Sequence, residues 1–198
     1  SSPVQFGQVS RPGDIKYKDL NHDGVIDSND QAPIGYNPVP EMTFSLAAGL
    51  NWKGIDFSIL LQGAARSSIY LQQDIAWDNF WGNYYEEHIG RWTPETAATA
   101  TYPRFTKATT AAHPNYYKSD YWLKDSKYLR LKNIQLGYTI PRKLLKKFGV
   151  RSLRVYANAY NLFTWDNVKK VDPESSNNSN GQFYPQQKVI NFGINLNF

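Results

Sequence analysis

Apolar and polar residues alternate strictly along several stretches of the chain. In EMTFSLAAGLNWK, the even positions from Met42 to Trp52 are apolar, whereas the odd positions are mostly small or polar. IDFSILLQGAAR continues the alternation after Gly54, a residue that permits a tight turn. A period of two is typical of a β-strand that has one face in an apolar environment. The pattern therefore predicts a strand hairpin over residues 42–66.

Three later stretches show the same period. In KYLRLKNIQLGYTI the apolar phase shifts between Leu131 and Ile134, which indicates either a β-bulge near Asn133 or a strand that leaves the apolar band. RSLRVYANAYNLF follows after a short basic turn or helical segment, and the two stretches predict a second hairpin over residues 127–163. KVINFGINLNF sets an apolar row opposite asparagines and glycine, and it predicts a last strand over residues 188–198.

The connections between these strands are of two kinds. Those after Lys53 and Ile140 are short, whereas residues 67–126 and 164–187 form long connections rich in Tyr, Trp, Asn, Pro and Ser. Because consecutive antiparallel strands alternate in direction, both long connections lie on one side and both short turns on the other. Short periplasmic turns and long extracellular loops are typical of outer-membrane β-barrels. Residues 1–41, which precede the first strand, are then extracellular.

Composition supports a membrane barrel and argues against other classes. Aromatic residues make up 15% of the chain, a share typical of broad contact surfaces or of membrane-interface girdles. No apolar run approaches the ~20 residues that a membrane-spanning helix needs. The net charge is +5, but Lys and Arg are scattered among carboxylates, so we expect no nucleic-acid partner. The one dense basic run, PRKLLKKFGVR, is expected to be a periplasmic turn that meets water or lipid phosphates.

The predicted fold class is all-β, an antiparallel transmembrane β-barrel segment with long extracellular loops. The pattern gives about five spanning strands, fewer than the roughly eight that one chain needs to close a barrel. We therefore expect residues 1–198 to be the C-terminal part of one larger barrel domain, or a protomer of a shared barrel. The absence of an initiator Met and of a signal segment indicates a processed or cut piece.

Several ordered motifs resemble one family. They are GDIKYKDLNHDGVIDSNDQAPIG, RWTPETAATATYPRF, SDYWLKDSKYLRLKNIQLGYTIPRKLLKKFGV, LRVYANAYNLFTW and the terminal FGINLNF. Together they cover nearly the whole chain, which resembles the closing third of the SusC/RagA-type, TonB-dependent outer-membrane transporters.

The resemblance implies a 22-stranded barrel with a plugged lumen in the outer membrane of a Gram-negative bacterium. It also implies import of oligosaccharides, or of peptides in some branches. The implied partners are the N-terminal remainder of the barrel with its plug, a SusD-like surface lipoprotein that acts as a lid, the TonB complex, and outer-membrane lipid. The plug and the TonB-contacting segment have no counterpart in this chain.

KDLNHDGVIDSND has the oxygen spacing of a calcium loop. Gly24 stands at the sixth position of the loop, where the chain must turn back on itself. Pro12 and Pro33 on either side argue against the flanking helices of an EF-hand. We expect a structural clip for Ca²⁺, with Mg²⁺ as an alternative and a metal-free acidic turn as the other interpretation. The candidate ligands are Asp19, Asn21, Asp23, Val25, Asp27 and Asp30.

The stretch IAWDNFWGNYYEEHIGRW is dense in aromatic residues among carboxylates and amides, the side chains that stack on sugar rings and bond their hydroxyls. The other interpretation is that these rings pack the loop onto itself or onto a partner. We expect no catalytic residues, because a loop fixes no separation between Glu86 and Glu87, and the three histidines are expected on surface loops. The candidate substrate contacts are Trp77, Trp81, Tyr84, Tyr85 and Trp92, with Arg66 and Asn158 from the polar face of the strands.

A function of another class fits part of the same pattern. A secreted, calcium-stabilised β-sandwich that binds carbohydrate would also show alternating strands and an acidic loop. Such a module would bury its apolar faces between two sheets and would be soluble without detergent. A passive porin fragment also fits the alternation, although not the family motifs. The two main hypotheses therefore differ in what covers the apolar face.

Overall fold

The computed structural model describes residues 4–78, 84–106, 113–169, 171–175 and 184–198. The chain forms two compact units. The described part of the first unit comprises residues 4–35, 70–78, 84–106 and 113–124. The second comprises Tyr36–Ile69 and, among the described residues, 125–169, 171–175 and 184–198.

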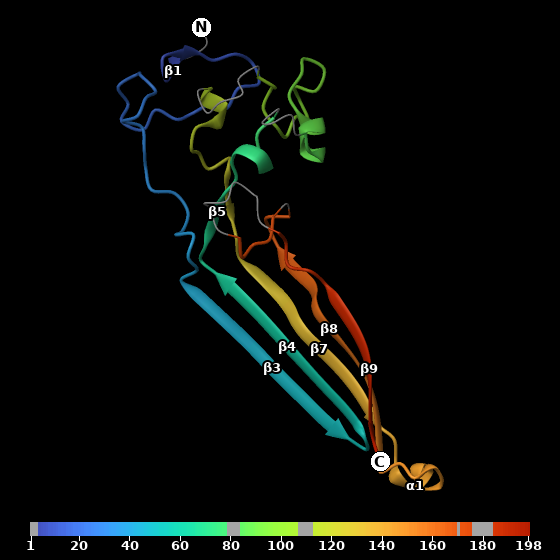
Figure 1. The fold of residues 1–198 in the computed structure, drawn as a ribbon. Coiled ribbons are helices and arrows are strands. Elements are labelled where there is room, and N and C mark those ends of the chain that lie inside the picture. Colours follow the sequence, from blue (N-terminus) through green and yellow to red (C-terminus); the bar gives the residue numbers. More distant parts are fainter. Residues whose placement is uncertain (1–3, 79–83, 107–112, 170, 176–183) are drawn as a thin grey trace. The chain divides into compact units, whose positions relative to one another are not determined.

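The second unit is built on a five-stranded antiparallel sheet with the strand order β3-β4-β7-β8-β9 (Figure 1). Because each strand pairs with the next long strand in the chain, the sheet is a meander, and β3 and β9 are its edges among the described residues. The all-β, antiparallel fold class is thereby confirmed. The strands are β3 (Met42–Trp52), β4 (Ile55–Ala65), β7 (Tyr128–Thr139), β8 (Ser152–Asp166) and β9 (Val189–Asn197).

The irregular points of the sheet follow from local sequence. Lys53 and Gly54 both have positive φ, 49° and 90°, and they connect Trp52 to its partner Ile55 in a two-residue turn. Positive φ at both central positions matches the twist of the flanking strands. The predicted bulge is confirmed, since the β7 register shifts between Leu131 and Asn133. Strand β8 continues to Asp166, three residues past the predicted hairpin end at 163.

The cross-strand register places the apolar rows of all five strands on one face. These side chains are not covered: Leu50 is 61% exposed, Leu136 55% and Phe192 81%. The other sheets of the described residues have two strands each, too small to form a sandwich with this one. A continuous apolar surface of this kind marks a membrane or interaction face. One row across the sheet comprises Leu50, Phe57, Leu136, Ala157 and Phe192.

Between β7 and β8 the chain forms a short helical turn, α1 (Arg142–Leu145) followed by the 3-10 helix η5 (Lys146–Phe148). Leu145 is buried at 6% exposure, and Gly149 ends the turn with a left-handed φ of 69°. Within the described part of the chain, no helix has the length and apolar character needed to span a membrane.

The segments predicted as extracellular loops hold several short elements and a core. The first unit contains the two-stranded sheet of β1 (Val4–Gln5) and β2 (Gln8–Val9), and the 3-10 helices η1 (Gln73–Ile75), η3 (Glu86–Gly90) and η4 (Pro114–Tyr116). A further two-stranded sheet pairs β5 (Ser68–Tyr70) with β6 (Leu123–Asp125). The buried apolar residues of the first unit are Ile26, Leu71, Ala76, Trp77, Tyr102, Tyr116 and Trp122.

Candidate functional site

The polar face of the sheet carries an ion pair that crosses a whole strand. Arg154 of β8 donates to Asp56 of β4 through Nε at 2.9 Å and a terminal nitrogen at 2.5 Å. Gly137 of β7 lies between them, and a Cβ at that position would fall 2.5 Å from the Asp56 carboxylate and 2.6 Å from the Arg154 guanidinium. Glycine is therefore the residue that lets the pair form across β7. Asp56 and Arg154 come from the two strands whose alternation predicted a polar face.

The same face continues into a ring and an amide pair. The Tyr156 ring lies over Gly193 of β9, whose Cβ would fall 2.6 Å from a ring carbon, and the Arg154 guanidinium lies 4.8 Å from the ring centre. Asn191 Nδ2 donates to Asn158 Oδ1 at 3.0 Å. An aromatic face beside side-chain amides can stack on and hydrogen-bond a polar ligand. Asn158, a predicted contact residue, thus lies where the alternation placed it.

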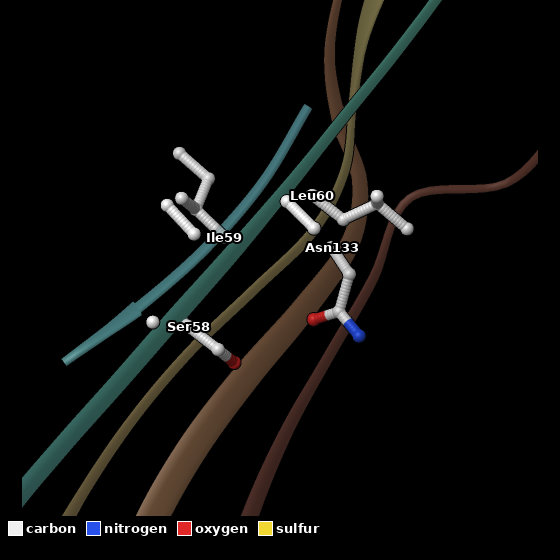
Figure 2. Close-up of a pocket in the computed structure, with 7 residues that line it drawn as sticks. Ser58, Ile59, Leu60 and Asn133 are labelled. Atoms are coloured by element: carbon white, nitrogen blue, oxygen red, sulfur yellow. The ribbon is translucent and has the colours of Figure 1, made fainter. Parts of the chain in front are cut away.

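A shallow depression of about 340 Å³ lies on the sheet where β3, β4 and β7 meet. It forms because Ala47, Ala48 and Gly49 of β3 have little side-chain volume. Figure 2 shows Leu60 and Asn133 on one side of the sheet and Ile59 on the other. None of its lining residues is titratable, so the depression offers hydrogen bonds and apolar contact only.

The most buried charge in the second unit is Arg130 of β7, which is 2% exposed. Its guanidinium donates to both oxygens of Asp172, at 2.8 and 2.9 Å, and to Glu174 Oε2 at 2.5 Å. Arg130 Nε also donates to the Thr164 hydroxyl of β8 at 3.0 Å. Tyr128 donates to the other Glu174 oxygen at 2.7 Å. These bonds tie residues 172–174 of the connection after β8 back onto the polar face of the sheet.

This cluster is not apparent from local patterns in the sequence. Asp172 and Glu174 are 42 and 44 residues from Arg130, so no local spacing joins them. A signal was nevertheless present, since Arg130 is a cation inside a strand and the following long connection carries two acids two positions apart. Such a cation needs an acidic partner when it is buried.

The acidic loop adopts a tight turn of its own. Asp19 accepts from the backbone N–H of His22 at 2.6 Å and of Gly24 at 2.9 Å, and Gly24 has a φ of 82°. Asp30 accepts from the N–H groups of Leu20 and Asp27 at 2.7 and 2.9 Å. The hydrogen bond from the Asp27 N–H, and to a smaller extent that from the Leu20 N–H, holds the pKa of the Asp30 carboxyl below its ordinary value. Asp30 is therefore ionised at neutral pH.

The other candidate ligands of the loop also bond its backbone. Asn21 Oδ1 accepts from Asp23 N at 3.0 Å, Asp23 Oδ1 from Val25 N at 2.8 Å, and Asp27 Oδ1 from Asn29 N at 2.7 Å. The donor set is all oxygen, which suits a hard cation. The described residues include no group of three or more His, Cys, Asp or Glu side chains arranged to hold a metal. The side chains thus match calcium by type, while their oxygens face backbone N–H groups.

Trp77, a candidate substrate contact, lies in the core of the first unit at 4% exposure and stacks on Tyr116 at 4.8 Å between ring centres. Next to it, the buried Asp78 accepts from the Tyr116 hydroxyl at 2.7 Å and from the Tyr102 hydroxyl at 3.4 Å. Trp77 therefore offers a ligand little surface. This packing corresponds to the second interpretation of the aromatic stretch.

The remaining candidate contacts are spread over the two units. Tyr84 is 57% and Tyr85 38% exposed, so both present ring surface, whereas Trp92 is half-buried over the backbone of Gly13. Arg66 is exposed, and one of its guanidinium nitrogens lies 3.8 Å from a Glu41 carboxylate oxygen. Trp81 lies outside the described residues. Within the first unit, the described candidates differ in exposure: Trp77 is buried, Trp92 is half-buried, and Tyr84 and Tyr85 are exposed.

His88 corrects the expectation that the histidines lie on the surface. It is 2% exposed, its Nδ1 accepts from Tyr85 N at 3.0 Å, and its Nε2 lies 3.2 Å from the Ala76 carbonyl oxygen. Burial holds the pKa of the imidazole below its ordinary value. His88 is thus a neutral core residue that joins η3 to the segment after η1.

Comparison with known proteins gives these features a context. No family model matches the chain. The chain is 30% identical to the TonB-dependent receptor P26 of Formosa agariphila over 94% of its own length and 20% of that protein. It is 26% identical to the TonB-dependent receptor SusC of Bacteroides thetaiotaomicron over 98% of its length and 18% of SusC. This chain is a relative of the SusC/RagA-type TonB-dependent receptors.

Solved structures agree on the fold of the chain. The RagAB peptide importer in its open-open state matches 87% of the chain with a TM-score of 0.66 and 24% identity, over 19% of that chain. Its closed-closed state matches 86% with a TM-score of 0.65 and 23% identity, over 18% of that chain. The chain spans about a fifth of the length of the proteins that it matches. The resemblance stated from the motifs is thereby confirmed.

The buried Arg130 gives a testable consequence for stability. Replacing Arg130 by Gln leaves Asp172 without its cation and Glu174 with only Lys132, 3.8 Å away. Removing one partner of a buried ion pair costs roughly 3–5 kcal/mol. We expect hydrogen exchange of residues 171–175 to accelerate by about a hundredfold or more in the protein in detergent.

Two further variants control this experiment. Arg130→Gln combined with Asp172→Asn and Glu174→Gln removes all the charges and should recover much of the protection. Arg66→Gln removes an exposed pair and should have no measurable effect on residues 171–175. Unchanged exchange in Arg130→Gln would contradict the anchoring role of Arg130.

Proposed function

We propose that this chain is part of the wall of a TonB-dependent importer in the outer membrane of a Gram-negative bacterium. The observation that carries the proposal is the uncovered apolar face of the five-stranded sheet, opposite a face of ions, amides and rings. Backbone polar groups can lie in lipid only when they are paired within helices or closed barrels. The kinship with TonB-dependent receptors supports the same placement.

In this proposal the polar face lines the lumen and the function is transport without catalysis. The earlier strands of the full-length receptor close the barrel, and a plug fills it. A SusD-like lipoprotein covers the extracellular opening, and the TonB complex supplies the energy that rearranges the plug. The loop bound by Arg130 lies on the polar face, so it narrows the space available to a ligand there.

We propose oligosaccharides as the imported substrate. Tyr156 offers an aromatic face beside Asn158 and Asn191, a combination that suits the apolar CH faces and dense hydroxyls of a sugar. Peptides are the second candidate. They are favoured by the fold shared with the RagAB peptide importer, which is a likeness in architecture.

Uptake by cells that express the full-length receptor tests import and substrate together. We expect Tyr156→Ala with Asn158→Ala to reduce oligosaccharide uptake at limiting concentration by at least about fivefold, because a stacking face and a hydrogen bond are lost. Val155→Ala, on the apolar face next to Tyr156, is the matched control and should leave uptake unchanged. The amount of receptor in the outer membrane is measured in parallel.

Each result has a distinct meaning. Uptake of peptides and not of oligosaccharides would replace the substrate class while keeping import. Uptake of neither, by receptor that is present in the outer membrane, would refute import through this protein. If the protein were recovered in the soluble fraction, the secreted carbohydrate-binding module would become the leading hypothesis.

We further propose that the acidic loop binds Ca²⁺, with Mg²⁺ as the weaker alternative, through Asp19, Asn21, Asp23, Asp27, Asp30 and the Val25 carbonyl. The support is the all-oxygen donor set around a glycine turn. A bound cation would supply charge that lets these carboxylates lie close together and would stiffen the loop.

Calcium binding is testable on the full-length receptor without a transport readout. Hydrogen exchange of residues 19–30 should slow when calcium replaces EDTA, and magnesium should have a smaller effect at the same concentration. Asp19→Asn with Asp23→Asn should abolish the calcium effect, whereas Asp120→Asn, an exposed acid in the same unit, should preserve it. No calcium-dependent change in the unmodified protein would refute the site.

A further inference from the structure

One end of the sheet carries an exposed cationic surface, here called the basic turn and defined as Lys53 and residues 140–151. Thr139 N donates to the Gly54 carbonyl at 2.7 Å, and Arg151 N to the Asn197 carbonyl at 2.8 Å. These bonds bring the β3–β4 turn, the α1 segment and the end of β9 to the same end of the sheet (Figure 1). The whole surface lies within the second unit.

Among the described residues, no acidic side chain pairs with the cations of the basic turn. Residues 140–151 include no Asp or Glu. The nearest acid along the chain from Lys53, Asp56, is bonded to Arg154. The unpaired cations are Lys53, Arg142, Lys143, Lys146, Lys147 and Arg151.

Exposed apolar side chains accompany these cations. Leu145 anchors the segment in a buried position, but Leu144 is 65% exposed and Phe148 76% exposed. A short segment with two bare apolar side chains among cations matches the chemistry of a lipid interface, where the apolar groups enter the acyl boundary and the cations meet phosphates.

Aromatic side chains at the neighbouring strand ends mark the expected boundary between the hydrocarbon region and the headgroups of a membrane. Trp52 and Tyr138 lie on the apolar face at this end and are 59% and 41% exposed. Lys53 Nζ lies 4.8 Å from the Trp52 ring centre. Aromatic side chains collect where the hydrocarbon region of a membrane meets its headgroups. The basic turn begins one residue beyond this level, at Lys53.

We propose that the basic turn binds the headgroups of anionic glycerophospholipids in the leaflet at this end of the barrel. The proposal rests on the proposed membrane placement of the sheet. The occupant follows from charge complementarity, because clustered cations without acids select anionic over zwitterionic headgroups. The lipid phosphates pair with Lys143, Lys146 and Lys147, while Leu144 and Phe148 enter the acyl region beneath them.

Native mass spectrometry of the full-length receptor in detergent tests this site with two lipid probes, phosphatidylglycerol and phosphatidylcholine, supplied in equal amounts. The unmodified receptor should retain phosphatidylglycerol preferentially. Lys143→Gln, Lys146→Gln and Lys147→Gln together should lower that preference by at least about tenfold. The matched control, Lys16→Gln, Lys18→Gln and Lys118→Gln, removes the same charge from exposed lysines of the first unit and should leave the preference intact.

A shift of the unheated band on a denaturing gel reports whether each variant is folded. If the triple variant does not fold, the three single variants take its place and should show graded losses. A folded triple variant with an unchanged phosphatidylglycerol preference would overturn the lipid site while leaving the importer intact. Failure to recover even the unmodified receptor from the outer membrane would instead refute the proposed function.

Discussion

The antiparallel ladder of backbone hydrogen bonds from β3 to β9 is the interaction on which the rest of this structure depends. It pairs the backbone polar groups of the inner strands, which is the condition for placing a sheet in an apolar environment. The ladder also fixes the register, and a slip of one residue would exchange the two faces. Every assignment of a side chain to the apolar or polar face therefore follows from this register.

On the polar face, glycines let side chains of one strand reach over the neighbouring strand. Gly137 and Gly193 leave room for the side chains of β8, so that Arg154 reaches Asp56 across β7 and Tyr156 lies flat over β9. A larger side chain at either glycine would displace them. At the opposite end of the face, the Arg130 guanidinium donates to two carboxylates from the chain after β8, those of Asp172 and Glu174. The result is a polar surface whose charges are held by neighbours.

The sequence was most informative where the signal is local. The alternation from Met42 to Ala65, the Lys53–Gly54 turn and the phase shift near Asn133 each predicted what the sheet shows, because strand pairing by short turns is encoded by neighbours. Contacts between distant residues were not accessible in this way. Nothing near Asp14 in the sequence indicates that it pairs with Arg104. In the first unit, Arg104 Nε lies 2.6 Å from Asp14 Oδ1.

The aromatic stretch shows a second limit. Trp77 and Tyr84 lie in the same aromatic-rich stretch, and both are candidate ligand contacts. Trp77 is nevertheless buried against Tyr116, whereas Tyr84 is exposed. Composition cannot separate these fates, since both core packing and ligand stacking use the flat face of a ring. Composition does not reveal the burial of His88 either. Its bonds to Tyr85 and Ala76 form only after the segment folds.

Site-directed spin labelling along β3 in outer-membrane vesicles is the most direct test that the apolar face meets lipid. This chain has no cysteine, so single cysteines at positions 43 to 50 can be labelled without background from it. The lipid-facing arrangement predicts that the even positions are relaxed by oxygen and the odd positions by a water-soluble nickel chelate, with a period of two. Even positions that are relaxed by the chelate and not by oxygen would contradict the membrane placement.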